Sequence, residues 1–264
     1  MMEKHDKTGL IGGTGFEDLA HVLVDETRRV DTVYGEPSSP LRVARWRVTD
    51  GDSHTDCPVV FLSRHGFDHR IPPHRVNYRA NLSALKSAGC QRVVGIYAVG
   101  GIHEKMQAPG HVVIPDQIID YTSGRIASYW DDDTQAALHV DFTDPYTPSL
   151  SKQLVIAAKE LEKETGYEIS SSGVYAAVNG PRLESAAEIR RIARDGGDIV
   201  GMTGMPEAAL ARELALDFAA LCVVVNPAAG LSDGLITFEM IESALKIGRQ
   251  RVYDILGAFF AKTT

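Results

Sequence analysis

Short apolar runs recur along the chain and predict buried strands. They lie at residues 9–11, 58–62, 92–96, 111–119, 173–178, 199–202 and 218–225. These runs lack the alternation of apolar and polar residues that marks a sheet with one face in water. The pattern therefore predicts a central sheet that is covered on both faces.

Segments of helical composition separate many of these runs. They lie at residues 77–88, 152–165, 183–195, 207–216 and 237–262. Gly89 and Gly166 follow two of them, at the position where glycine commonly ends a helix. Strands that alternate with helices predict an α/β fold. No linker or repeat divides the sequence, so we expect one domain over residues 1–264.

Composition narrows the class of protein. Hydrophobic residues make up 44% of the chain and charged residues 23%, which excludes a disordered chain, a collagen-like repeat and a coiled coil. The 27 Lys and Arg against 35 Asp and Glu give a formal net charge of −8. That charge argues against general binding to nucleic acid or to an anionic membrane.

The cysteines and the N-terminal residues indicate a compartment. Cys57, Cys90 and Cys222 are odd in number, far apart and without CxxC spacing, which fits a reduced protein and gives no zinc motif. The first residues lack an apolar stretch of signal-peptide length, and no run is long enough to span a membrane. We therefore expect a cytoplasmic protein.

Polar residues follow the first predicted strands, where open α/β sheets bind ligands. Thr14 lies in a glycine-rich turn, which is either an anion-binding nest or a tight turn, because it lacks the spacing of a dinucleotide fingerprint or a P-loop. Arg64 and His65 follow the second strand. Arg64 would bind phosphate through its planar, bidentate guanidinium, and His65 would donate to phosphate or carry a proton. Alternatively, the two residues form a surface pair within a loop.

The histidines at 65, 69 and 74 raise the question of a metal site. Spacings of four and five residues converge only on a helix, and Pro72 and Pro73 exclude a helix interior there. We therefore predict no metal.

The later strand ends add an acid, a hydroxyl and an amide. Glu184 is expected in the first turn of a helix, where the helix dipole alone explains a carboxylate, but it would also accept N–H donors from a ligand. Thr203 would cap a turn or bind a ligand oxygen, and Met202 would lie in the core or under a sugar. Asn226 would satisfy a neighbouring backbone group or recognise a heterocycle. Together these residues predict a concave site for a small ligand with an anionic and a heterocyclic part.

A series of motifs resembles a known family. In order between residues 12 and 230 they are GGTG, SRHG with HRIPPHRVNYRANL, AVGGI, QAPGHVVIPDQIIDYT, NGPRLES, GMTGMPEA and VNPAAG. They resemble the methylthioadenosine phosphorylase branch of the trimeric purine nucleoside phosphorylases over nearly the whole chain. The resemblance implies one nucleoside phosphorylase domain with a mixed central β-sheet flanked by helices, and a homotrimer.

The implied reaction is phosphorolysis of a purine nucleoside, with inorganic phosphate as co-substrate and without metal or cofactor. Its transition state resembles an oxocarbenium ion, so catalysis is positioning and electrostatics. By resemblance, the phosphate-binding groups are Thr14, Arg64, His65, Thr203 and the backbone near Ala98. His65 would also be a catalytic residue that donates to phosphate or carries a proton. Met202 would lie under the ribose, and His139 would face the 5′ end of the substrate in a neighbouring subunit.

The base pocket departs from the adenine-specific members of that family. Their TDYD-like run, with two aspartates, is replaced by Asn226, Pro227 and Ala228, and Leu183 and Glu184 stand where they have an aromatic residue and serine. Glu184 with Asn226 is the pair found in 6-oxopurine nucleoside phosphorylases. A 6-oxopurine offers N1–H to the carboxylate, whereas adenine would leave it unpaired, at about 1–3 kcal/mol. We therefore predict a hypoxanthine-type base, with Glu184 as the specificity residue and Asn226 as the catalytic residue that stabilises N7 as it gains a proton.

The pocket for the 5′ group is predicted to be apolar. Leu231, Leu235, Ile236 and Phe238 follow Asn226 and would line it, with Phe238 as a second specificity residue, unless they serve ordinary helix packing. The predicted reaction converts S-methyl-5′-thioinosine to hypoxanthine and 5-methylthioribose 1-phosphate in purine salvage. The alternatives are a methylthioadenosine phosphorylase, a general inosine and guanosine phosphorylase, a nucleoside hydrolase and a non-catalytic purine-binding protein.

Overall fold

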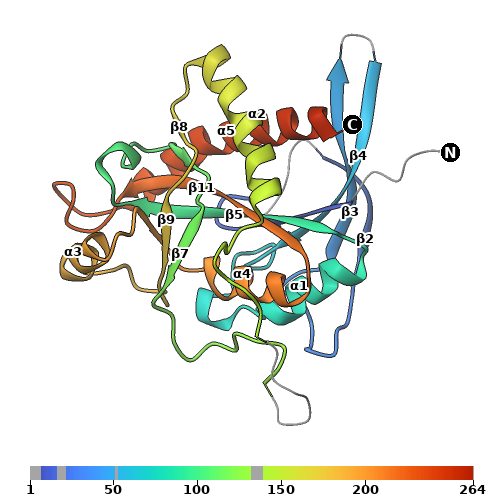
Figure 1. Cartoon of the computed structure of the whole chain (residues 1–264), viewed down its shortest axis with the longest axis horizontal. Helices are drawn as coiled ribbons and strands as arrows, with labels where there is room; N and C mark the ends of the chain where they lie inside the picture. The colour runs from blue at the N-terminus through green and yellow to red at the C-terminus, as the bar shows by residue number, and fades with distance from the viewer. Residues whose placement is uncertain (1–6, 17–21, 51–52, 132–138, 264) are drawn as a thin grey trace.

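A computed structural model gives the structure of residues 7–16, 22–50, 53–131 and 139–263 (Figure 1). These residues form a mixed β-sheet with helices on both faces. The strands are β1 (Thr8–Gly12), β2 (Val22–Arg28), β3 (Leu41–Asp50), β4 (Ser53–Ser63), β5 (Arg92–Gly101), β6 (Val112–Val113), β7 (Gln117–Asp120), β8 (Ile169–Ser170), β9 (Val174–Ala177), β10 (Ile199–Gly201) and β11 (Asp217–Pro227). The helices are α1 (Tyr78–Ser87), α2 (Pro148–Thr165), α3 (Ala186–Arg194), α4 (Gly204–Glu213) and α5 (Phe238–Thr263), with short 3-10 turns η1 (Pro73–Arg75) and η2 (Glu104–Met106).

The central strands come from distant parts of the chain. β5 pairs in parallel with both β1 and β11, and β1 pairs in parallel with β4. β10 is antiparallel to the end of β5 and continues through the parallel strands β9 and β7. On the other side, β4, β3 and β2 form antiparallel pairs. The predicted mixed sheet is therefore confirmed.

Apolar side chains fill both faces of the inner strands. One buried cluster packs α2 and α5 on the sheet through residues such as Leu154 and Val252. A second cluster packs α1 and α4 on the sheet through residues such as Leu82 and Leu210. Figure 1 shows these two pairs of helices on opposite sides of the sheet. Continuous apolar runs in β1, β4, β5 and β11 follow from this double coverage.

The outer strands β2 and β3 do not follow the apolar pattern, and that pattern did not predict them. β2 is largely exposed, whereas in β3 Ala44 and Trp46 are buried and the intervening Arg45 is exposed. Arg45 forms ion pairs with Asp25 at 2.7 Å and Asp56 at 2.9 Å, which join β3 to both of its neighbours. These strands form through cross-strand contacts rather than through an apolar run of their own.

Helix α3 begins later than the sequence predicts. Ser185 is the N-cap, and its side chain accepts from the backbone N–H of Glu188, whose side chain accepts from the backbone N–H of Ser185 in return. Glu184 therefore lies before the helix, and its expected place in the first helical turn is wrong.

Candidate active site

A cavity of about 410 Å³ lies at the carboxyl ends of β1, β4 and β11 and beside β5. The predicted site residues in its lining are Thr14, Arg64, His65, Ala98, Leu183, Glu184, Met202, Thr203 and Asn226. They come from segments spread over most of the chain. Parallel pairing with β5 and β1 brings the ends of β1, β4 and β11 to one edge of the sheet, and β10, which pairs antiparallel with the end of β5, brings Met202 and Thr203 to the same place. The cavity is the one place in the described structure where all of these groups meet.

Other predicted residues lie outside this lining. They are Pro227, Ala228, His139, Leu231, Leu235 and Phe238. Ala228 is buried next to the site, whereas His139 is exposed and Phe238 is 68% exposed at the start of α5. Of the residues predicted for the 5′ pocket, Ile236 lies in the lining, where Ile241, Leu183 and Met202 are among its other apolar residues.

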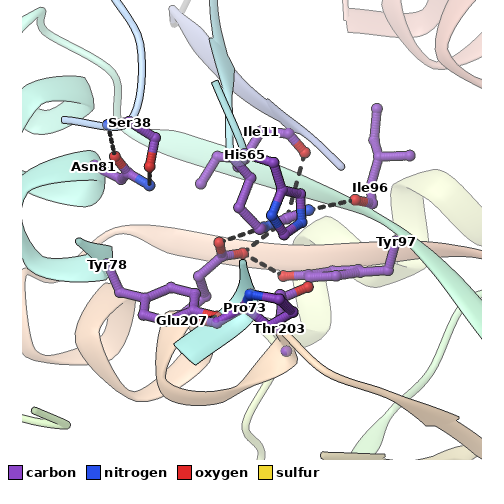
Figure 2. Close-up of polar contacts among 12 residues, drawn as sticks. Ile11, Ser38, His65, Pro73, Tyr78, Asn81, Ile96, Tyr97, Thr203 and Glu207 are labelled. Atoms are coloured by element: carbon purple, nitrogen blue, oxygen red, sulfur yellow. Dashed lines mark hydrogen bonds and ion pairs between the residues drawn. The ribbon is translucent and has the colours of Figure 1, made fainter. Parts of the chain in front are cut away.

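Arg64 is fixed by a buried acid that sequence reasoning missed. Its Nε donates to Oε1 of Glu207 at 2.6 Å and its Nη2 donates to Oε2 at 2.9 Å, and both side chains are fully buried. Nη1 donates to the carbonyl of Ile96 at 2.8 Å. Figure 2 shows the Tyr97 hydroxyl pointing at the Glu207 carboxylate, to which it donates at 2.7 Å. A bidentate pair of this kind fixes both the charge and the orientation of the guanidinium.

The electrostatics of this cluster keep Arg64 charged. Burial, the largest single effect, acts to lower the pKa of Arg64, but the charge and hydrogen bond of Glu207, together with Tyr97 and Tyr78, outweigh it and hold the pKa above its ordinary value. Burial also raises the pKa of Tyr97 well above its ordinary value, so its hydroxyl stays a donor. A Cβ at Gly13 would lie 2.6 Å from Nη1 of Arg64, so the residue at 13 must be glycine for the guanidinium to lie there.

His65 has a fixed tautomer. Its Nδ1 lies 2.7 Å from the carbonyl oxygen of Ile71, and because a carbonyl only accepts, Nδ1 carries the hydrogen. In the neutral ring Nε2 is then an acceptor, and in the cationic ring it is a donor. The ring of His69 packs against that of His65 with 4.7 Å between centroids.

A β-bulge in β11 brings Asn226 into the cavity. The pairing with β5 shifts register between Val224 and Asn226, so Val225 and Asn226 both line the cavity although neighbours in a regular strand face opposite ways. Nδ2 of Asn226 donates to the carbonyl of Pro227 at 2.6 Å. This bond sets the orientation of the amide, and Oδ1 is left as an acceptor.

Glu184 separates the cavity from a second one of about 580 Å³, which Arg182 and Glu188 also line. Burial raises the pKa of the Glu184 carboxyl, and the charge of Glu188 raises it further, against opposing effects of a backbone hydrogen bond and of Arg182. Arg182 forms an ion pair with Glu188 at 2.8 Å, so the charge of Glu188 largely offsets the effect of Arg182 on Glu184. A ligand N–H at this point would stabilise the ionised form of Glu184.

The part of the chain that the structure describes contains neither a metal cluster nor a membrane helix. No three of its His, Cys, Asp and Glu side chains are grouped to hold a metal ion. None of its helices is both long and apolar enough to cross a membrane.

The sequence matches the family model of the phosphorylase superfamily over residues 7–261. The chain belongs to this superfamily. A Pseudomonas syringae pv. tomato protein named probable S-methyl-5′-thioinosine phosphorylase is 49% identical over 243 residues, which cover 92% of this chain and 94% of that protein. The 6-oxopurine nucleoside phosphorylase of Pyrococcus furiosus is 41% identical over 259 residues, which cover 96% and 91%. Methylthioadenosine phosphorylase from Schistosoma mansoni in complex with adenine matches with a TM-score of 0.86 and 30% identity, covering 97% of this chain and 91% of that one.

These comparisons confirm the predicted family, the mixed α/β fold and the enzyme class, a pentosyltransferase of the purine nucleoside phosphorylase type. The predicted reaction agrees with the names of several relatives. Sequence analysis did not identify Glu207 as a residue of the site. It lies in the GMTGMPEA motif, but nothing local distinguished it from an acid at the start of a helix.

Proposed function

We propose that the chain catalyses phosphorolysis of S-methyl-5′-thioinosine to hypoxanthine and 5-methylthioribose 1-phosphate in purine salvage. The observation that carries this proposal is a carboxylate and an amide, from Glu184 and Asn226, in the same cavity as Arg64 and His65. We call Leu183, Glu184 and Asn226 the base-binding set, and Thr14, Arg64, His65 and Thr203 the phosphate-binding set.

The base-binding set suits a 6-oxopurine. The Glu184 carboxylate accepts N1–H, a donor that hypoxanthine has and adenine lacks. Asn226 accepts N7–H with Oδ1, since its Nδ2 is held by the Pro227 carbonyl at 2.6 Å. Adenine would place its N1 acceptor against a half-buried carboxylate, which costs about 1–3 kcal/mol.

The phosphate-binding set supplies donors of fixed direction. One hydrogen of Arg64 Nη1 is donated to Ile96 at 2.8 Å, and the second serves phosphate. The hydroxyls of Thr14 and Thr203, the His65 ring and the backbone near Ala98 complete the set. Inorganic phosphate is the co-substrate, and the scheme uses no metal or organic cofactor.

Catalysis follows from holding the two reactants in line. A phosphate oxygen bonds to C1′ while the bond from C1′ to N9 breaks, and the bonding electrons leave with the purine. The purine takes a proton from solvent at N7, and Asn226 accepts a hydrogen bond from that N–H and stabilises it. Met202 lies under the ribose, and positive charge develops there between phosphate and base. Positioning of this kind supplies about 7–11 kcal/mol of barrier reduction in favourable cases.

The 5′-methylthio group would pack on Ile236, which belongs to the predicted 5′ segment, and on Ile241, which follows that segment in α5. We propose a cytoplasmic homotrimer in which His139 of a neighbouring subunit approaches the 5′ end. Phe238 keeps its proposed role in specificity, although it is 68% exposed in the single chain.

A general 6-oxopurine nucleoside phosphorylase is the second candidate. It would use the same base-binding and phosphate-binding sets, and the 41% identity to the Pyrococcus furiosus enzyme supports it. The two candidates differ only in the 5′ group that the pocket accepts.

Base release from S-methyl-5′-thioinosine, methylthioadenosine and inosine, each with and without phosphate, tests the proposal. We expect phosphate-dependent release that is fastest from S-methyl-5′-thioinosine. Faster release from inosine would favour the second candidate, and faster release from methylthioadenosine would refute the role given to Glu184. Base release at the same rate with and without phosphate would indicate a hydrolase.

A further inference from the structure

Arg125 lies outside the cavity and connects two of the loops that contribute to its lining. Its Nη1 donates to the carbonyls of Met202 at 2.8 Å and Met205 at 2.6 Å, after the end of β10. Its Nη2 donates to the carbonyl of Asn179 at 2.8 Å and, more weakly, to that of Val178 at 3.4 Å, after the end of β9. One planar guanidinium therefore ties two segments that are not adjacent in sequence.

The two tied segments carry different parts of the proposed chemistry. The loop after β9 leads to Glu184, and the loop after β10 contains Met202 and Thr203. Nη1 of Arg125 also reaches the hydroxyl of Tyr78 at 3.3 Å, and that hydroxyl donates to the carbonyl of Pro73 at 2.8 Å. The connection thus extends to a third loop that lines the cavity.

The segment that bears Arg125 is itself anchored on both sides. The backbone N–H of Ser123 donates to the side chain of Asn179 at 3.1 Å. Ser128 and the backbone N–H of Tyr129 donate to the carboxylate of Glu213 in α4, at 2.8 Å and 2.7 Å. The guanidinium is therefore presented by a fixed backbone, which lowers the entropy cost of its hydrogen bonds.

Arg125 does not line the 410 Å³ cavity, so it acts through the residues that do. It borders a separate surface cavity of about 370 Å³ with Tyr78 and Arg79. Its hydrogen-bond partners in the described structure are carbonyl and hydroxyl oxygens that Nη1 and Nη2 reach, whereas its buried Nε has no partner among the described residues. A planar cation with several donors suits such a set of acceptors.

We propose that Arg125 is a positioning residue that holds Glu184 of the base-binding set in register with Met202 and Thr203. This inference rests on the proposed function for its kinetic consequences, but not for its structural ones. The backbone N–H of Val178 still donates to the carbonyl of Gly201 at 2.9 Å, so loss of the guanidinium loosens the two loops beyond that bond. The nucleoside and phosphate are then no longer held at one fixed separation. Misplacement by about 1 Å lowers rates by as much as about 10²-fold.

Kinetics of Arg125→Ala test the proposal, with Arg79→Ala as the matched control. Arg79 borders the same surface cavity but pairs with exposed Asp131 at 2.6 Å. We expect Arg125→Ala to lower kcat/KM for S-methyl-5′-thioinosine by about 10–100-fold and to raise the KM of both the nucleoside and phosphate. Arg79→Ala should keep wild-type constants. Arg125→Lys keeps the charge without the planar fork and should recover little of the loss.

Chemical rescue separates positioning from lost stability. The vacated position opens to the surface cavity, so added guanidinium should restore part of the activity of Arg125→Ala, whereas urea, which is neutral, should not. Amide hydrogen exchange should rise in both residues 178–184 and residues 201–206 of Arg125→Ala, and in neither for Arg79→Ala.

Wild-type kcat/KM in Arg125→Ala below its unfolding temperature, or wild-type exchange in either loop, would overturn the inference. If Arg125→Ala does not fold, the same exchange and kinetic criteria apply to Arg125→Lys. A wild-type enzyme that cleaves no nucleoside would refute the proposed function, and the exchange experiment would still decide the role of Arg125.

Discussion

The two ends of the cavity are built in different ways. In the phosphate-binding set, Arg64 is completely buried and locked to Glu207, and His65 is 6% exposed. In the base-binding set, Leu183 is 46% exposed and Glu184 is half-buried in a loop between β9 and α3. Phosphate is the same in every reaction of this kind, so its donors are best held rigidly. The base differs between substrates, and a loop before a helix accepts substitutions that a buried ion pair does not.

The largest effect is expected where the buried ion pair is broken. Glu207→Gln leaves the Arg64 cation without a countercharge in a fully buried place, and we expect it to lower the free energy of unfolding by about 3–5 kcal/mol. Urea denaturation measures this loss. Glu26→Gln, which breaks the exposed pair of Glu26 with Arg28, is the control and should leave unfolding nearly unchanged. Equal effects of the two variants would mean that the phosphate-binding set is not locked as described.

A smaller effect is expected from exchanging the base-binding pair. Glu184→Ser combined with Asn226→Asp should raise the use of methylthioadenosine relative to S-methyl-5′-thioinosine by about 10–100-fold, because the N1–H acceptor is removed and a carboxylate is placed near N7. The ratio of kcat/KM for the two nucleosides measures this change, and the KM for phosphate should stay close to wild type. An unchanged ratio would show that base selection lies elsewhere.

The smallest effect is expected from pH. Burial raises the pKa of Glu184 in the folded protein, so lowering the pH toward that pKa protonates the carboxyl and removes the acceptor for N1–H. The kcat/KM for S-methyl-5′-thioinosine should therefore fall on the acidic side, and Glu184→Gln should lose this limb of the profile. A pH–rate profile of both proteins makes the comparison, and an acidic limb that persists in Glu184→Gln would assign it to another group.

The raised pKa of Glu184 also affects stability, and it does so in the opposite direction: activity rises with pH through this range, whereas the free energy of unfolding falls. A folded-state pKa above the unfolded one means that the folded protein holds the proton more tightly, so stability falls as pH rises through this range. Glu184→Gln removes that penalty and should raise the midpoint of thermal unfolding near neutral pH while lowering activity.

Much of the fold followed from local pattern. The central strands were predictable because both of their faces are buried, which makes them apolar throughout. β2 and β3 were not, because cross-strand pairs rather than an apolar run stabilise them. The start of α3 was predicted too early, since the capping box of Ser185 and Glu188 begins the helix only after Glu184.

The sequence by itself determined which polar groups stand at the strand ends, from Thr14 and Arg64 to Glu184 and Asn226. The parallel strands β1, β4, β5 and β11 bring their carboxyl ends to one edge, so order along the chain was enough to expect that Thr14, Arg64 and Asn226 meet. The strands β9 and β10 run antiparallel to β5, so only the tertiary structure decided that Glu184 joins them. Only the tertiary structure decided what holds them: Glu207 lies 143 residues from Arg64, and Arg125 reaches Met202 from 77 residues away. Helix and strand periodicities report neighbours within a few residues, whereas a hydrogen bond across such a separation exists only once the strands have packed.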